Sequence, residues 1–77
     1  MSSRAIVLVE TAVGIVSEVT STLKELDEVT AVDGVLGPYD VIAIVESEDF
    51  DSIWYIVTAK INAVAGVSRT IVCAIQQ

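Results

Sequence analysis

The sequence predicts an α+β fold, in which four antiparallel strands form one sheet and two helices cover one of its faces. Two stretches place apolar residues at spacings of three and four, which is typical of amphipathic helices. Four other stretches are short runs rich in β-branched residues, which favour strands. Between the second and third of these runs stands Gly37-Pro38, a pair that indicates a turn. The chain has 77 residues, so we expect a single domain over 1–77.

The first strand and the first helix are predicted within the first 27 residues. Residues 4–10 (RAIVLVE) form a continuous run of strand length, and residues 11–14 (TAVG) interrupt it. The helix is expected to begin at Ile15 and to end near Asp27. Its apolar positions are Ile15, Val16, Val19, Leu23 and Leu26, with Glu18, Lys24 and Glu25 on the outer side.

A hairpin is predicted next. Residues 29–36 (VTAVDGVL) form the second strand, in which Asp33-Gly34 indicates a β-bulge or a frayed pairing, because glycine inside a strand often marks a bulge. The turn Gly37-Pro38-Tyr39-Asp40 follows, and residues 41–46 form the third strand.

The second helix has the clearest pattern. Ser47, Glu48 and Asp49 are candidate N-caps that also place acidic charge at the helix start. We expect the helix to stop at Ala65-Gly66, where glycine supplies a left-handed residue. The fourth strand is predicted over 67–75, followed by a tail at 76–77. The expected buried positions of the helix are Phe50, Ile53, Trp54, Val57, Ile61 and Val64.

The resulting order, β-α-β-β-α-β, is the split-βαβ or ferredoxin-like plan. Right-handed crossovers place both helices on the same face of the sheet. The other face is then uncovered, yet the strands are apolar on both sides. Ile6, Leu8, Ile42 and Ile44 alternate with small and branched apolar residues, and in the fourth strand Ile71, Cys73 and Ile75 alternate with Val72 and Ala74.

This second apolar face predicts a homodimer that packs through its sheets. Apolar residues make up 53% of the chain and its mean hydropathy is +0.70, which is high for a small soluble monomer. Burying half a dozen such side chains gives about 10 kcal/mol at roughly 25 cal/mol per Å². A monomer rarely leaves so large an apolar patch bare, and a two-fold copy is the simplest cover. The alternative is that frayed strand ends make the face smaller.

Charge and composition exclude several classes of function. The net charge is −7, with four scattered basic residues, so we expect no direct nucleic-acid binding. Uncharged runs are too short to span a membrane, no signal peptide is visible, and we expect a cytoplasmic protein. One cysteine excludes an internal disulfide and a cysteine-based zinc cage, and there is no histidine.

Asp40 is the strongest candidate for a polar ligand contact. Its carboxylate can accept hydrogen bonds from an ammonium group, while the turn amides around Gly37 can receive a carboxylate. The structural alternative is a turn aspartate that caps its own backbone. Tyr39 either covers a ligand or occupies a half-exposed turn, and Thr70 either binds a ligand or makes a cross-strand pair.

Other chemistry-bearing residues have simpler interpretations. Cys73 is expected to be a small buried hydrophobe, and Trp54 a core residue, whereas Tyr55 lies off the buried positions and could serve an interface. The acidic residues at 46–51 resemble a metal site in composition alone, since helix capping explains them. No nucleophile has an adjacent base and no glycine loop could hold phosphate, so we expect no enzyme activity and no cofactor.

The predicted elements and the motifs between them together resemble the ligand-binding domain of the Lrp/AsnC transcriptional regulators, also called the RAM domain. The resemblance covers nearly the whole chain and includes Gly14 before the first helix and the acidic start of the second helix. Its sharpest parts are Gly37-Pro38-Tyr39-Asp40-Val41 and Val64-Ala65-Gly66-Val67-Ser68-Arg69-Thr70.

The resemblance implies a ferredoxin-like domain that dimerises through its sheets and assembles further, into an octamer or decamer. It implies a small effector, usually an amino acid, near contacts between dimers, and it carries ligand-binding roles over to Gly37, Tyr39, Asp40 and Thr70. Full-length regulators also carry a helix-turn-helix, for which residues before Arg4 leave no room. We therefore expect a stand-alone effector domain that could modulate full-length relatives. The alternatives are a dimeric αβ-barrel oxygenase or isomerase, and a purely structural assembly partner.

Overall fold

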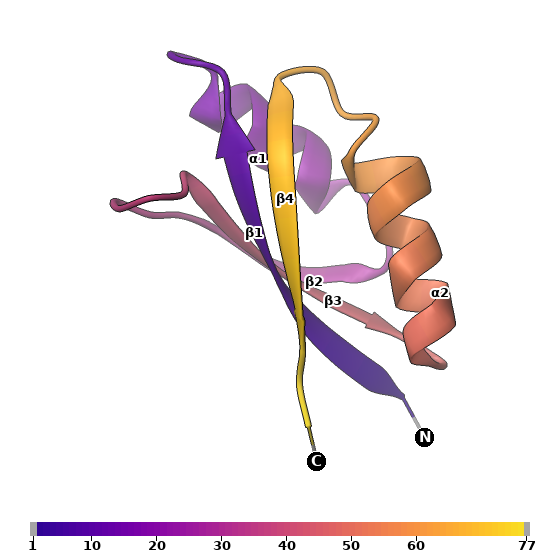
Figure 1. Cartoon of the computed structure of the whole chain (residues 1–77). Helices are drawn as coiled ribbons and strands as arrows, with labels where there is room; N and C mark the ends of the chain where they lie inside the picture. Colours follow the sequence, from indigo (N-terminus) through magenta and orange to yellow (C-terminus); the bar gives the residue numbers. More distant parts are fainter. Residues whose placement is uncertain (1, 77) are drawn as a thin grey trace.

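A computed structural model describes residues 2–76 and has the predicted order of elements (Figure 1). The strands are β1 (Ser3–Thr11), β2 (Val29–Gly34), β3 (Val41–Ser47) and β4 (Val67–Ala74). The helices are α1 (Val16–Lys24) and α2 (Phe50–Tyr55), and α2 continues directly into a π-helix, η1 (Ile56–Ile61). The prediction of a ferredoxin-like βαββαβ fold is confirmed. Of the predicted tail, Gln76 follows β4 and residue 77 lies outside the described residues.

The four strands form one antiparallel sheet in the order β2-β3-β1-β4. β1 lies between β3 and β4, with Ile6 opposite both Ile44 and Cys73, and Leu8 opposite both Ile42 and Ile71. Residues that face each other across a sheet point to the same side. The register therefore divides the side chains of β1, β3 and β4 into two sets, one toward the helices and one away from them.

The set toward the helices forms the core. Six side chains of the two central strands are buried against α1, α2 and η1: Ala5, Val7, Val9, Val41, Ala43 and Val45. The helices contribute Val19, Leu23, Ile53, Ile56, Val57 and Ile61. Figure 1 shows α2 on one side of the sheet and the tip of the β2–β3 hairpin projecting on the other.

The set away from the helices forms what we call the open face: Ile6, Leu8, Ile42, Ile44, Ile71, Cys73 and Ile75. Ile71 is 41% exposed and Cys73 is exposed, while the other side chains of the open face are partly buried. The expectation that the strands are apolar on both sides while the helices cover one is confirmed. The expectation that Cys73 is buried is wrong for the single chain, since Cys73 lies on the open face.

The first half of the chain differs from prediction in two details. Helix α1 ends at Lys24 rather than near Asp27. The predicted irregularity in β2 exists but is misplaced: the register shifts between Val29 and Ala31, whereas Asp33 and Gly34 pair regularly with Ile42 and Val41. The strand ends at Gly34 rather than at Leu36, because the chain then leaves the sheet to form the hairpin tip.

The second helix departs further from the prediction than the first half of the chain does. Asp49 caps it as expected, accepting a 2.8 Å hydrogen bond from the Ser52 amide. The last turn is π-helical, with the Asn62 amide bonded to the Val57 carbonyl five residues back at 2.9 Å. The predicted core positions of Phe50 and Trp54 are wrong, and Phe50 is 42% exposed. Trp54 is 53% exposed because it lies about 100° around the helix from buried Ile53.

Gly66 is left-handed, with φ of 96°, but it does not end the helix, which stops at Ile61. Its carbonyl accepts a 2.9 Å hydrogen bond from the Ala12 amide, which joins the start of β4 to the chain after β1. A Cβ at this position would collide with the Ile15 side chain. Gly66 is therefore required both by its backbone conformation and by close packing.

Candidate functional site

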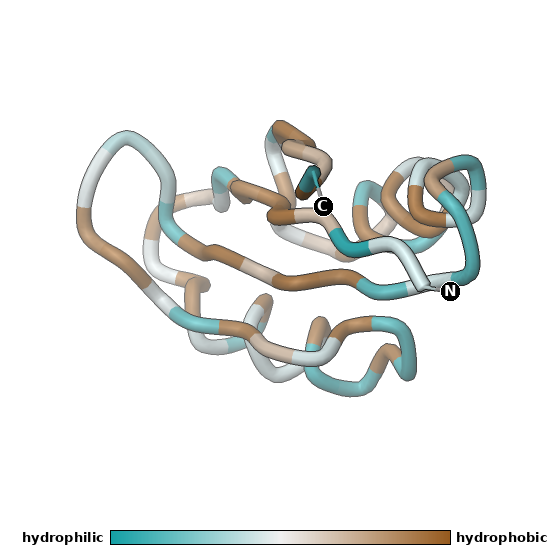
Figure 2. The backbone as a smooth tube through the Cα atoms, turned by 90° about the horizontal axis from the view of Figure 1, so that it is seen from below, coloured by the Kyte–Doolittle hydropathy of each residue, from teal (hydrophilic) through white to brown (hydrophobic). Residues whose placement is uncertain are grey.

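The tip of the β2–β3 hairpin stands over the open face of the sheet and forms the candidate site. A hollow of about 470 Å³ lies between the tip and the sheet, and we call it the hairpin hollow. Leu8 and Ile42 line it from the sheet, and residues 35–39 line it from the tip. Figure 2 shows hydrophobic residues reaching the hairpin tip, at the far left of the view. The lining is apolar apart from the backbone and the Tyr39 hydroxyl.

Asp40 ties the base of the hairpin to the end of β1. One carboxylate oxygen, Oδ2, accepts hydrogen bonds from the Thr11 amide at 2.8 Å and from the Thr11 hydroxyl at 3.3 Å. The Asp40 amide donates to the Val9 carbonyl at 3.0 Å, and its carbonyl accepts from the Val35 amide at 2.9 Å. Asp40 is therefore a structural anchor in the isolated chain. It holds the end of β1 rather than capping its own turn.

Gly37 shapes the tip itself. Its φ of 147° lies in a region that residues other than glycine rarely adopt. A Cβ at this position would meet nothing within 4 Å. The requirement for glycine is thus conformational, since space would allow a side chain. Leu36, next to it, is fully exposed.

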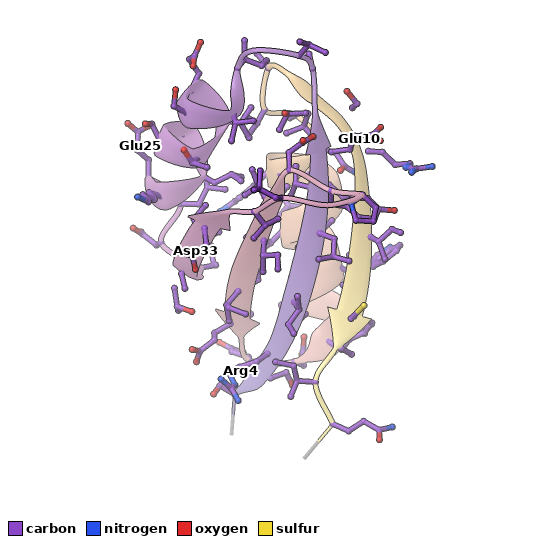
Figure 3. The ribbon with its side chains drawn as sticks, turned by 90° about the vertical axis from the view of Figure 1, so that its left-hand side faces the viewer. Arg4, Glu10, Glu25 and Asp33 are labelled. Carbon is purple, nitrogen blue, oxygen red and sulfur yellow. The ribbon has the colours of Figure 1, made fainter. Side chains whose placement is uncertain are left out.

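Tyr39 contacts a charged pair at the end of the sheet. The Arg69 guanidinium lies 5.7 Å from the centroid of the Tyr39 ring, and its Nη2 donates to the Tyr39 hydroxyl at 3.5 Å. Arg69 also lies 3.8 Å from Glu10, its cross-strand partner. Glu10 and Arg69 are on the same side of the sheet as Leu8 and Ile71. Figure 3 shows Glu10 at one end of β1 and Arg4 at the other.

Thr70 stands apart from the hairpin residues. It pairs with Val9, whose side chain is buried on the helix side, so Thr70 also faces the helices. Its hydroxyl donates to the Asn62 side-chain oxygen at 2.8 Å, just after η1. The structure thus brings Gly37, Tyr39 and Asp40 together at the hairpin and leaves Thr70 on the other face.

Sequence reasoning did not identify Arg69 and Glu10 as part of the candidate site. Each is an ordinary surface charge when considered alone. The usable signal was that Arg69 follows the Gly-Val motif of β4 in a chain with four basic residues. Placing it beside Tyr39 required the register of β1 with β4 and the position of the hairpin tip.

A second, more polar hollow of about 380 Å³ lies near the start of α2. It contains an ion pair between Lys60 Nζ and Glu28 Oε2 at 3.0 Å. The hydrogen bond from Lys60 holds the pKa of Glu28 below its usual value, and the same bond raises the pKa of Lys60. Asp49 also lines this hollow, and its pKa is lowered by the hydrogen bond from the Ser52 backbone amide.

Residues 2–76 contain no group of three or more acidic or cysteine side chains arranged to hold a metal ion. Over the same residues, no helix is long and apolar enough to cross a membrane.

Several solved structures match the chain along nearly its full length. The structure of TTHA0845 from Thermus thermophilus has a TM-score of 0.91 and 31% identity, covering 97% of this chain and 94% of that one. The structure of the hypothetical protein PHS023 from Pyrococcus horikoshii has a TM-score of 0.89 and 28% identity, covering 100% and 92%. No curated protein matches the sequence.

A third structure is that of the transcriptional regulator NMB0573 from Neisseria meningitidis in complex with L-Met. It has a TM-score of 0.86 and 14% identity, and the match covers 97% of this chain and 50% of that one. At this identity the similarity shows a shared fold. The family model of the Lrp/AsnC ligand-binding domain matches residues 4–75, nearly the whole chain. The chain therefore belongs to the family of Lrp/AsnC ligand-binding domains.

Proposed function

We propose that this chain is a non-catalytic regulatory domain that assembles through the open face of its sheet and binds a small amino acid between subunits. The observation that carries the proposal is the open face, where seven apolar side chains of three adjacent strands lie with no helix over them. An exposed apolar surface of this kind marks an interaction site. A second copy across a two-fold axis covers it with an identical surface.

The hairpin supports the ligand part of the proposal. A ligand pocket is a concave, mostly apolar space with a few well-placed polar groups. The hairpin hollow is apolar, and the Tyr39 hydroxyl and the tip amides near Gly37 supply polar groups at its edge. It opens on the open face, so a partner subunit packed there closes it. NMB0573, which shares the fold, was solved with L-Met bound, and this supports an amino acid as the ligand.

The core supports a non-catalytic role. Among the described residues, every buried side chain is aliphatic except Thr11, which lies at the end of β1. Acid–base catalysis requires a titratable group at the reacting centre. A dimeric αβ-barrel enzyme needs such groups between helices and sheet, where this chain has valine, isoleucine and leucine.

We further infer a stand-alone cytoplasmic unit that forms an octamer or decamer, or that joins assemblies of full-length Lrp/AsnC regulators and alters their response. The full-length match to TTHA0845 and PHS023 supports a unit of this size. The net charge of −7 supports regulation without direct contact with DNA.

Thermal unfolding in the presence of each of the twenty amino acids tests the ligand. A ligand at 100 times its Kd stabilises the folded protein by about 2.7 kcal/mol. We expect at least one amino acid to raise Tm in the wild type and to raise it less in Asp40→Asn. Asp27→Asn, which removes an exposed carboxylate from the turn before β2, is the matched control and should respond like the wild type.

A purely structural assembly subunit is the competing function. It is favoured by the hydrogen bonds that already engage the candidate residues, from Thr11 to Asp40 and from Thr70 to Asn62. An unchanged Tm with every amino acid, in a protein that still assembles, would establish this second function and reject the ligand.

A further inference from the structure

We propose that Arg69 binds the carboxylate of the effector, and that the effector is an amino acid with an apolar side chain, which occupies the hairpin hollow. This inference rests on the proposed function and adds to it a residue and a class of ligand. It follows from the position of Arg69, from its weak existing contacts, and from the lining of the hollow.

Arg69 lies at the edge of the hairpin hollow. Leu8 forms part of the floor, and Glu10 lies two residues further along β1 on the same side of the sheet. Glu10 is opposite Arg69, so Arg69 is one side-chain position beyond the floor. Tyr39 both lines the hollow and contacts the guanidinium. A ligand that occupied the hollow and extended toward Glu10 would therefore reach Arg69.

The guanidinium retains most of its binding capacity. Arginine has five N–H donors in a planar fork that fits a carboxylate. Its polar contacts within residues 2–76 are a long hydrogen bond of 3.5 Å to the Tyr39 hydroxyl and a 3.8 Å approach to Glu10. Its side chain is 64% exposed. An exposed ion pair of this length contributes little to stability, so the pair has no strong structural role.

The surrounding groups hold Arg69 in place and complete a zwitterionic site. Contact with the Tyr39 ring orients the guanidinium, since cations are attracted to aromatic faces. Glu10 places a carboxylate beside it that can accept a ligand ammonium group. The site thus places a cation and an anion side by side, where they can pair with the α-carboxylate and the α-ammonium group of a free amino acid.

The hairpin hollow defines the side chain of the ligand. Its lining residues are Leu8, Val35, Leu36, Gly37, Pro38, Tyr39 and Ile42, which carry no formal charge. Burying a charged or amide side chain there without a partner would be unfavourable. Apolar side chains such as those of leucine, methionine or phenylalanine fit this lining, whereas aspartate or lysine does not.

Isothermal titration calorimetry on the intact protein tests the inference with L-leucine, L-methionine, L-phenylalanine, L-aspartate and L-leucinamide. We expect the wild type to bind one or more of the three apolar amino acids. We expect L-aspartate to bind at least tenfold more weakly, and L-leucinamide likewise, because the amide lacks the carboxylate. Arg69→Gln should weaken binding at least tenfold, and Arg69→Lys should restore part of it.

Arg4→Gln is the matched control, because Arg4 is the exposed arginine at the opposite end of β1 (Figure 3). It should bind as the wild type does, and light scattering should give the same mass for all three variants. If no amino acid binds the wild type, the proposed function fails together with this inference. If the wild type binds and Arg69→Gln binds equally well, or loses binding only because its mass falls, the inference alone is wrong.

Discussion

Replacing Ile6 with aspartate should separate the subunits without unfolding them. Ile6 occupies the centre of the open face, between Ile44 on β3 and Cys73 on β4. It points away from the helices and is partly exposed in the single chain, so the core does not depend on it. In an assembly through the open face, its position becomes fully buried.

The expected magnitude follows from two effects. The isoleucine is already partly buried, so its removal forfeits about 1 kcal/mol of the 1.5–3 kcal/mol available from full burial. A carboxylate placed in an apolar interface costs several kcal/mol after relaxation. A two-fold axis brings in two such residues. The total of at least about 6 kcal/mol corresponds to a rise in the dimer Kd of more than about 10⁴-fold.

Sedimentation velocity over a range of concentrations measures this change. Val13→Asp is the matched control, because Val13 is fully exposed in the turn before α1 and away from the open face. Ile6→Asp should sediment as single chains with unchanged helical circular dichroism, and Val13→Asp should sediment as the wild type does. Equal assembly of Ile6→Asp and Val13→Asp would refute the assignment of the open face as the interface.

Cys73 gives a second measurement of the same surface. It is exposed in the single chain and adjacent to Ile6. A thiol reagent should therefore label Cys73 slowly in the assembled wild type and rapidly in Ile6→Asp. Rapid labelling of the assembled wild type would place the subunit contact elsewhere.

Two further predictions concern stability, measured by thermal or urea unfolding at fixed protein concentration. Gly66→Ala should lower the free energy of unfolding more than Gly14→Ala does. The positive φ costs about 1–2 kcal/mol at both positions, and at Gly66 alone the Ile15 side chain must also move aside for the new Cβ. Equal losses would contradict the packing. Glu28 has a pKa below its usual 4.5 because of its hydrogen bond with Lys60, so its stabilising effect is complete above pH 4.5 and is lost as the pH falls through the lowered pKa. Glu28→Gln should therefore lose less stability than the wild type between pH 6 and pH 3, and an unchanged acid dependence would contradict this.

The sequence was sufficient to predict the fold and the open face, because both depend on local periodicity. Alternation along a strand places Ile6 and Leu8 opposite to Val7 and Val9 whatever the partners are. The apolar spacing of the first helix likewise identified Val19 and Leu23 as buried. These features needed no knowledge of contacts distant in sequence.

The features that the sequence did not predict depend on contacts between residues distant in sequence, or on departures from regular α-helical geometry. Trp54 fits a helical stripe together with Phe50, but the sheet contacts Ile53 and Ile56, and the π-helical turn then aligns Ile56 with Ile61 five residues on. Cys73 was expected to be buried but is exposed on the open face, and the helices that cover the other face leave it uncovered.

The candidate site was predicted in part for the same reason. Gly37, Tyr39 and Asp40 are adjacent in sequence and therefore adjacent in space. Thr70 faces the helices, and Arg69 faces the hairpin, because side chains alternate along β4. Only the register with β1 shows which of these two neighbours lies beside Tyr39.

The mass of the wild-type protein in dilute solution tests the central claim most directly. Multi-angle light scattering at low micromolar concentration should give at least twice the 8.2 kDa of one chain. A stable, well-folded species of 8.2 kDa would show that the open face tolerates water, and would contradict the account of assembly.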